Sequence, residues 1–302
     1  MLRLHSSELR THLDGPKHFS RRRKLDFVTL ICWFMAGQRA AVQTGLDHFF
    51  AVVRNQADLV RQVTAQALSR ARKHLPVAVF DDLSQCLLEL VGQHVGIPFW
   101  HGLRVVATDG SSVRVTIRDA MRRIRYAQVF GLYLPGVEMM LHATLYSCDT
   151  GERQMLFEHL ARLHHDDLLV MDRGYPASWL MAAMISRQLN FCVRVDATGS
   201  AAVKAFIRGQ AIEAIVEMPA PSAQDALDYE IAREPFRVRL IRIITPDGLI
   251  RVLATNLLDP HAWPATDFGA SAGASKKPST AFHNALLRMS LNIKAQLARD
   301  VR

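Results

Sequence analysis

Two short apolar segments, each ending in an aspartate, constrain the fold of this chain more than any other feature. The first runs from Val105 to Asp109 and the second from Leu168 to Asp172, and a glycine follows each aspartate within two residues. Short apolar runs bounded by turn residues predict buried strands. Because a carboxylate is not stable unpaired in an apolar core, we expect each aspartate where its strand ends, at a mouth of the sheet.

The two aspartates together predict a metal site. If their strands are parallel neighbours, both carboxylates leave the same edge of the sheet, where open sheets place their ligands. Mg²⁺ prefers carboxylate oxygens and water, and paired divalent ions support phosphodiester chemistry. We therefore expect Asp109 and Asp172 to be catalytic residues that bind Mg²⁺ or Mn²⁺. The alternative is that either one is a turn or helix N-cap residue, as aspartate before serine or glycine often is.

Three segments follow one another as they do in a known family. They are Asp109-Gly110-Ser111, Asp172-Arg173-Gly174-Tyr175 and the later strand Val252–Leu258. In this order they resemble blocks of insertion-sequence transposases, the group with a ribonuclease H-like core and an Asp, Asp, Glu catalytic triad. The resemblance covers residues 25 to 270 and is most specific from Leu168 to Asp196. It implies that Asp109 and Asp172 take the first two metal-ligand positions.

The resemblance also implies a fold and a domain organisation. The expected fold class is α/β, a ribonuclease H-like mixed sheet with flanking helices, an N-terminal helical domain and a strand-rich insertion. The expected parts are a helical DNA-binding domain (1–100), the first part of the core (101–196), the insertion (197–250), the last core strand (251–270) and a disordered or irregular tail outside the family sequence (271–302).

The third carboxylate of the family is missing from its expected place. The family carries this glutamate on a helix after the Thr-Asn-Leu strand, in a signature of Tyr, Arg, Glu and Lys, but here no acidic residue occurs from Phe268 to Arg299. The composition changes after Gly269 to small and basic residues typical of a linker. Our hypothesis is a frameshift near residue 270 that removed the catalytic helix. A rival hypothesis assigns the third position to Asp259 or Asp267, although neither lies on a convincing helix.

Basic residues predict where DNA would be contacted. Lys and Arg outnumber Asp and Glu by 37 to 28, and the net charge of +9 attracts polyanions. The predicted helix from Val63 to Leu75 carries its basic residues outside its apolar face, as a recognition helix or an ordinary surface helix would. Intramolecular ion pairs are the alternative for all of these charges. The candidate DNA-binding residues are Arg70, Arg72, Lys73, Arg122, Arg123, Arg173, Arg237 and Arg239.

Composition excludes several other classes of protein. The longest apolar run, Phe27 to Ala36, is far shorter than the roughly 20 residues that cross a bilayer, and charged and polar residues open the chain where a secretory signal would lie. We therefore expect a cytoplasmic protein with no membrane partner. The cysteines show no zinc-type spacing and are predicted to be reduced core residues: Cys32, Cys86, Cys148 and Cys192.

The sequence thus predicts the function that the resemblance implies. That function is a DNA transposase that binds terminal inverted repeats and catalyses metal-dependent strand cleavage and transfer. The expected partner is double-stranded DNA, both at the element ends and at the target, and the protein is expected to bind it as a homodimer. Without a third carboxylate, this copy is expected to be inactive. The alternatives are a non-catalytic DNA-binding remnant of such a transposase and a related metal-dependent nuclease.

Overall fold

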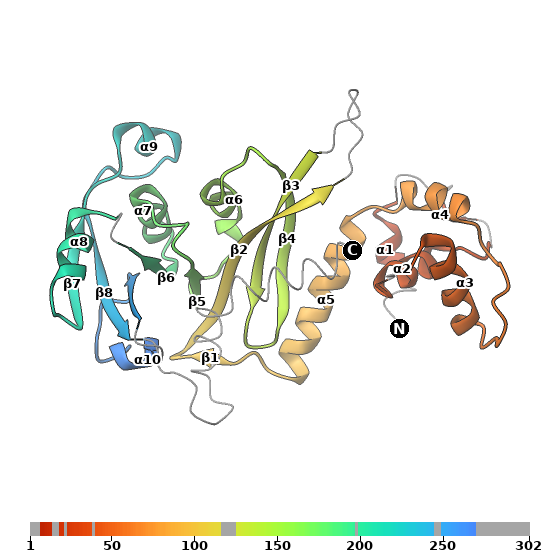
Figure 1. Cartoon of the computed structure of the whole chain (residues 1–302), viewed down its shortest axis with the longest axis horizontal. Coiled ribbons are helices and arrows are strands. Elements are labelled where there is room, and N and C mark those ends of the chain that lie inside the picture. The colour runs from red at the N-terminus through yellow and green to blue at the C-terminus, as the bar shows by residue number, and fades with distance from the viewer. Residues whose placement is uncertain are drawn as a thin grey trace. The chain divides into compact units, whose positions relative to one another are not determined.

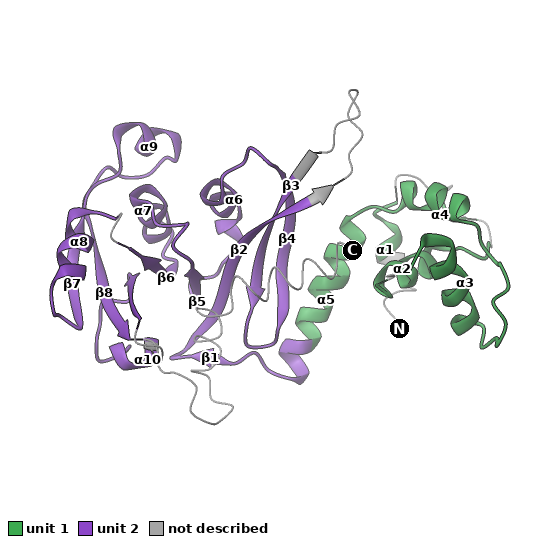
Figure 2. Cartoon of the chain, in the orientation of Figure 1, with its two compact units in different colours: residues 1–90, 298–302 green, residues 91–297 purple. Residues whose placement is uncertain are grey.

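The structure, a computed structural model, shows a mixed α/β protein in which helices flank a mixed sheet (Figure 1). The chain forms two compact units, coloured separately in Figure 2, with their boundary between Leu90 and Val91. Unit 1 is the N-terminal part, and unit 2 contains the sheet. The residues that the structure describes are 7–13, 18–20, 23–37, 40–115, 125–196, 199–244 and 249–269.

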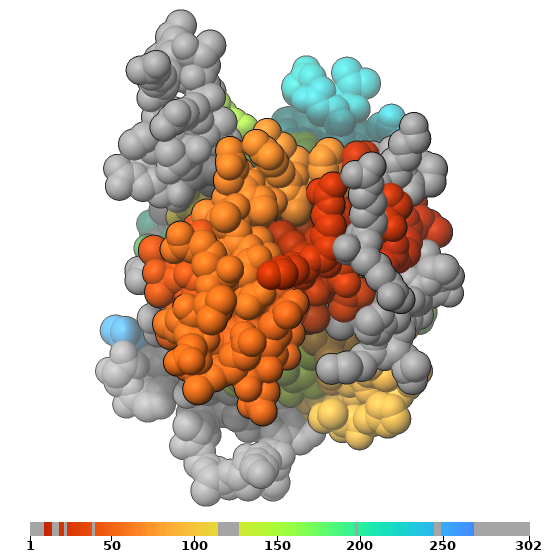
Figure 3. Space-filling view, turned by 90° about the vertical axis from the view of Figure 1, so that its right-hand side faces the viewer, coloured from red at the N-terminus to blue at the C-terminus, as the bar shows by residue number. Residues whose placement is uncertain are grey.

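Unit 1 is helical throughout its described part. Leu30, Leu46 and Leu68, one from each of three helices, meet in an apolar core. The Asp26 carboxylate accepts a 2.8 Å hydrogen bond from the Thr29 amide and so caps the first turn of its helix. Figure 3 shows the red and orange segments of this unit forming one packed face. The helices are α1 (Ser7–Arg10), α2 (Phe27–Met35), α3 (Val42–Val53), α4 (Ala65–Ala71) and α5 (Ala78–His94), which continues into unit 2.

Unit 2 is built on one sheet, which has nine strands in its described residues, in the order β4-β3-β2-β5-β6-β9-β8-β7 with β1 beside β2. Strands β2, β3 and β4 form an antiparallel meander, whereas β5 and β6 run parallel to β2 and follow α6 and α7. The strands are β1 (Phe99–Trp100), β2 (Leu103–Val115), β3 (Arg125–Leu134), β4 (Met139–Ser147), β5 (Asp167–Met171), β6 (Asn190–Val195), β7 (Glu213–Met218), β8 (Phe236–Ile244) and β9 (Ile250–Thr255). The helices are α6 (Glu152–His159), α7 (Ser178–Ser186), α8 (Ala201–Arg208), α9 (Ala223–Asp228) and α10 (Ala265–Gly269).

Both faces of the sheet are covered around β2. Side chains alternate between the faces of a strand, and Ala107 of β2 and Val170 of β5 lie in one apolar cluster with Phe268 of α10. Gly110 faces the other side of β2, where it meets Glu152 of α6. Helices α6 and α10 therefore pack on opposite faces, so that strands in this region are apolar on both sides.

The segment predicted as a strand-rich insertion continues the core sheet. Strand β9 pairs antiparallel with β6, β8 with β9 and β7 with β8. Because β9 is antiparallel to β6, its C-terminal end lies at the sheet edge opposite to the ends of β5 and β6. Asp259 and Asp267 follow β9 in the sequence, so the chain reaches them from that opposite side of the sheet.

The prediction that Asp109 ends its strand is wrong. Strand β2 continues to Val115, and Gly110 pairs with Phe130 of β3. Only the pairing of β2 with β5 stops near the aspartate, at Ala107. The Gly-Ser sequence stays extended here because β3 supplies the hydrogen-bond partners that the backbone needs.

Two predictions from composition have an outcome in the structure. The thiol of Cys192 is fully buried, as predicted, but Cys148 is exposed, so the core prediction is wrong for that residue. Each described helix is too short or too polar to cross a lipid bilayer.

Candidate functional site

The two predicted metal ligands lie near the C-terminal end of β5, where this strand pairs with β2. The parallel register pairs Ala107 with Val170, so Asp109 and Asp172 each follow the last paired residue of their segment by two positions. Neighbouring strands lie about 4.8 Å apart. The prediction that the two strands are parallel neighbours is confirmed. Asp172 directly follows the last residue of β5, whereas Asp109 lies within β2, two residues beyond its last pairing with β5.

The two aspartates have different surroundings. The amide of Gly110 donates a 2.9 Å hydrogen bond to Asp109 Oδ1, which orients that carboxylate along the strand. The side chain of Asp172 is 46% exposed, and its Oδ1 lies 3.6 Å from Nη1 of Arg194 on β6. One carboxylate is thus held by the backbone, and the other reaches solvent beside a cation.

The structure adds a carboxylate that the sequence analysis missed. Glu152, the first residue of α6, lies against both glycines that follow the aspartates. A Cβ atom on Gly110 would lie 2.9 Å from Glu152 Oε1, and one on Gly174 would lie 3.0 Å from Oε2. Neither glycine has a positive φ, so their lack of a side chain serves the close approach of Glu152 and not a turn. These two glycines were the only signal for Glu152 in the sequence.

A buried tyrosine lies among the three carboxylates. Tyr175 is 1% exposed, and its hydroxyl makes no hydrogen bond with the described residues. Its pKa is raised first by burial and then by the negative charge of Glu152. The nearby hydroxyl of Thr108 acts in the opposite direction, and the charges of Asp109 and Asp172 add to the rise. All three carboxylates therefore act on one hydroxyl in the protein interior.

This group of residues suits a hard divalent cation in its donor chemistry. Its carboxylates come from β2, from α6 and from the loop after β5, and two glycines leave space between them. Such cations take carboxylate oxygens as ligands. Among the described residues, however, no three His, Cys, Asp or Glu side chains are close enough to enclose a metal ion. Closing around an ion therefore requires the side chains to move.

The rival third ligands lie elsewhere. Asp267 Oδ2 is 2.8 Å from Nε2 of His101, a residue that precedes β2. Asp259 Oδ1 accepts a 2.8 Å hydrogen bond from the amide of His261 and so caps its own loop. The hypothesis that either aspartate completes the site is wrong, because antiparallel β9 delivers them to the opposite edge of the sheet.

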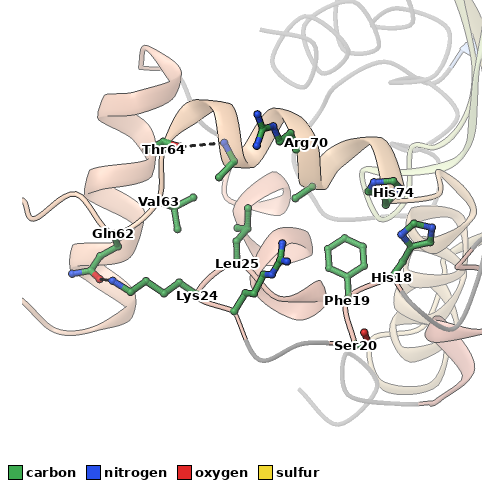
Figure 4. Close-up of a pocket in the computed structure, with 13 residues that line it drawn as sticks. His18, Phe19, Ser20, Lys24, Leu25, Gln62, Val63, Thr64, Arg70 and His74 are labelled. Carbon is green, nitrogen blue, oxygen red and sulfur yellow. Dashed lines mark hydrogen bonds between the residues drawn. The ribbon is translucent and has the colours of Figure 1, made fainter.

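A second candidate site is a basic pocket in unit 1. The pocket has a volume of about 750 Å³ and lies between α4 and the segment around Lys24 (Figure 4). Its floor includes the apolar side chains of Leu25 and Val63, and Figure 4 shows His18 and His74 beside each other at one end. The described lining residues include no carboxylate: His18, Phe19, Ser20, Arg23, Lys24, Leu25, Gln62, Val63, Thr64, Ala67, Arg70, Ala71 and His74.

The pocket keeps its positive charge available. In the described part of the chain, no carboxylate forms an ion pair with Arg23, Lys24 or Arg70. Lys24 Nζ donates instead to Oε1 of the neutral Gln62 at 2.7 Å. A phosphate group entering the pocket would therefore meet cations that are not already neutralised.

The predicted DNA-binding residues have different positions. Arg70 lines the pocket, whereas Arg72 and Lys73 are exposed on the short 3-10 turn after α4 and do not line it. Arg173 and Arg237 are exposed in unit 2. The remaining two, Arg122 and Arg123, lie outside the described residues.

The prediction that Arg239 binds DNA is wrong. This residue is 1% exposed and forms an ion pair with Glu213. Its Nη1 also donates a 2.6 Å hydrogen bond to the carbonyl of Trp263. The alternation of β8 suggested a solvated basic face, but both faces of this strand are covered and the guanidinium is used internally.

Comparison of the chain with models of known protein families gives no match, and comparison with curated proteins gives none either.

Proposed function

We propose that this protein is a DNA transposase of the ribonuclease H-like class, with Asp109 and Asp172 as its metal-binding catalytic residues. The observation that supports the proposal most is the parallel pairing of β2 with β5, since Asp109 and Asp172 each follow the last paired residues, Ala107 and Val170, by two positions. Carboxylates at such an edge are suited to divalent-cation chemistry on phosphodiesters. The proposal extends the family resemblance of the sequence to the site geometry.

The topology of the sheet supports the ribonuclease H-like part of the proposal. Three antiparallel strands are followed by two parallel strands, each reached through a helix, in the order β4-β3-β2-β5-β6. In this arrangement β5 ends beside the middle of β2, just before Asp109, while α6 packs on one face of β2. It is compatible with a core whose first and fourth strands carry the catalytic aspartates.

The residues of the site have separate tasks in this proposal. A divalent cation bound by the aspartates would help to activate the attacking oxygen and to stabilise the leaving oxygen. Asp109 is held in orientation by the Gly110 amide. Arg194, beside Asp172, offers positive charge to a phosphate at the same edge. Buried Tyr175 keeps solvent out beneath the carboxylates.

The pocket of unit 1 supports DNA as the partner. Arg23, Lys24 and Arg70 supply charge for the phosphate backbone, which dominates the affinity of proteins for DNA. Apolar Leu25 and Val63 in its floor offer contact surface for sugars and bases. We propose that this pocket holds part of the terminal repeat, with double-stranded DNA as the ligand and a homodimer as the bound form.

A cleavage assay tests the proposal directly. The full chain is incubated with Mg²⁺ and labelled duplex DNA that carries the sequences bordering its gene. We expect nicking at the element end that EDTA abolishes, and a rate lower by at least about 100-fold in Asp109→Asn, since even outer partners of a metal site are worth 10-fold to 100-fold. Failure of the wild-type chain to bind this DNA would contradict the proposal.

The second candidate is a DNA-binding remnant without catalysis. It is favoured by the lack of an acidic residue from Phe268 to Arg299, where the family glutamate is expected. Specific binding without nicking in the same assay would favour this candidate. Nicking without joining to a target would favour a metal-dependent nuclease.

A further inference from the structure

Glu152 is the carboxylate for which the proposed function has no role. It begins α6, on a different element from either aspartate, yet its two oxygens face the two segments that carry them. Oε1 is directed at Gly110, next to Asp109, and Oε2 at Gly174, just after Asp172. The side chain thus lies beside both backbone segments that carry the aspartates.

The carboxylate of Glu152 lies close to both glycines. A Cβ atom on Gly110 would lie 2.9 Å from Oε1, closer than real Cβ atoms come, and one on Gly174 would lie 3.0 Å from Oε2, which is tighter than most real contacts. A larger residue at either position would require the flexible end of the Glu152 side chain to shift. Gly151, the residue before it, has nothing within 4 Å of a Cβ atom and carries no such constraint. The close approach is therefore specific to the two segments that carry the aspartates.

An independent observation indicates that this cluster faces a ligand position. Tyr175 is buried to 1% exposure, and its hydroxyl has no hydrogen-bond partner among the described residues. A buried polar group without a partner is costly, and three carboxylates near one another repel unless a cation lies between them.

We propose that Glu152 is the third metal-binding carboxylate of this protein and completes the site formed by Asp109 and Asp172. This inference rests on the proposed function, because it assumes that the aspartates bind a divalent cation. In this proposal Glu152 takes the role of the glutamate that the family carries after its last core strand. The expectation that this copy is inactive depended on a missing third carboxylate, and Glu152 removes that reason.

The other acidic residues near the end of the described chain do not compete for this role. Asp259 and Asp267 lie at the opposite edge of the sheet and are engaged by their own loop and by His101. Glu158, on the same helix as Glu152, is exposed and accepts a 2.7 Å hydrogen bond from the hydroxyl of Tyr146. Glu158 is therefore a matched control for a change of charge in α6.

Binding of Mn²⁺ to the full chain, measured from the electron paramagnetic resonance signal of free Mn²⁺, tests the inference without requiring activity. We expect Glu152→Gln to raise the Kd for Mn²⁺ by at least about 10-fold, and Glu158→Gln to leave it within about twofold. Glu152→Asp keeps the charge but shortens the side chain, so its Kd should fall between those of the wild type and Glu152→Gln. Circular dichroism confirms that each variant is folded before titration.

Asp109→Asn separates failure of the inference from failure of the proposed function. If this variant loses Mn²⁺ binding while Glu152→Gln and Glu152→Asp bind as the wild type does, the role of Glu152 is overturned and the aspartate site stands. If the wild type binds no Mn²⁺, or Asp109→Asn binds it equally well, the metal site fails and Glu152 with it.

Discussion

Unit 1 and unit 2 each concentrate charge of one sign, but they do so by different structural means. The pocket of unit 1 collects cations from exposed segments that already stand out as basic in the sequence, around Lys24 and on α4. The edge of unit 2 collects carboxylates from β2, α6 and the loop after β5, which are distant along the chain. A binding surface for a polyanion needs only surface charge, whereas a metal site needs long-range packing that holds like charges together.

The largest expected effect concerns Arg239, a buried cation of unit 2 that stabilises the fold. Replacing it with methionine removes the ion pair with Glu213, whose side chain is 38% exposed, and the hydrogen bond to the carbonyl of Trp263, so we expect the free energy of unfolding to fall by about 2 kcal/mol. Urea denaturation followed by tryptophan fluorescence measures this loss. Arg237→Met, at an exposed position on the same strand, is the control and should change stability by less than about 0.5 kcal/mol.

The same pair of variants also tests DNA binding by β8. We expect Arg239→Met to bind DNA as the wild type does when both are measured without urea, at a temperature where the variant is folded. A stable Arg239→Met variant with weakened DNA binding would restore the interpretation of this residue as a DNA contact.

The next largest effect is expected at Gly110 and concerns only the carboxylates of unit 2. An alanine at this position would push its Cβ atom against Glu152 Oε1, so we expect Gly110→Ala to weaken Mn²⁺ binding by about 10-fold. Calorimetric titration with Mn²⁺ measures the change. Gly151→Ala, whose Cβ atom would meet nothing within 4 Å, should leave the affinity unchanged. Equal affinities for the two variants would show that Glu152 does not shape the site.

Arg70 gives a smaller effect that concerns only the pocket of unit 1. If Arg70 contacts a phosphate, Arg70→Ala should lower the slope of log affinity against log salt concentration by about 1. Arg72→Ala removes the same charge from a residue that does not line the pocket and should change the slope less. Fluorescence anisotropy with labelled duplex DNA at several salt concentrations measures both slopes. Identical slopes for the two variants would contradict a specific role for the pocket.

The smallest expected effect concerns pH and unit 2. Burial, with the charges of Arg162 and His159, lowers the pKa of His142 from 6.5 to about 4. Because the folded pKa is below the unfolded value, the unfolded chain binds the proton more readily between these limits. The contribution of this residue to stability is therefore complete above pH 6.5 and is lost as pH falls towards about 4. Thermal melting across this range should show a shallower pH dependence in His142→Gln.

The sequence predicted the parts of the site that depend on strands. Apolar runs ending near Asp109 and Asp172 identified β2 and β5, and the assumption that they are parallel neighbours places both aspartates at one edge. Residues of a strand have fixed spacing and direction, so pairing two strands determines which side chains meet. The sequence did not predict that β2 continues past Asp109, because this depends on partners supplied by β3.

Glu152 and Arg239 could not be placed from the sequence because their neighbours come from another layer. Glu152 lies beside the two segments that carry the aspartates because α6 packs on the face of β2 where Gly110 has no side chain. Arg239 belongs to an alternating pattern that is typical of a strand with one solvated face, yet that position is enclosed and occupied by Glu213. An alternating pattern indicates which residues share a face, but it does not state what covers that face.

By itself the sequence determined the local elements, the positive charge of the N-terminal segments and the resemblance on which the proposed chemistry depends. The tertiary structure decided that Glu152 lies beside Gly110 and Gly174, that Asp259 and Asp267 follow a strand that ends on the opposite side of the sheet, and that Arg239 is buried. The physical reason is that strand and helix preferences act over a few residues. The meeting of carboxylates from three elements depends instead on the direction of each strand and on the helix that packs against it.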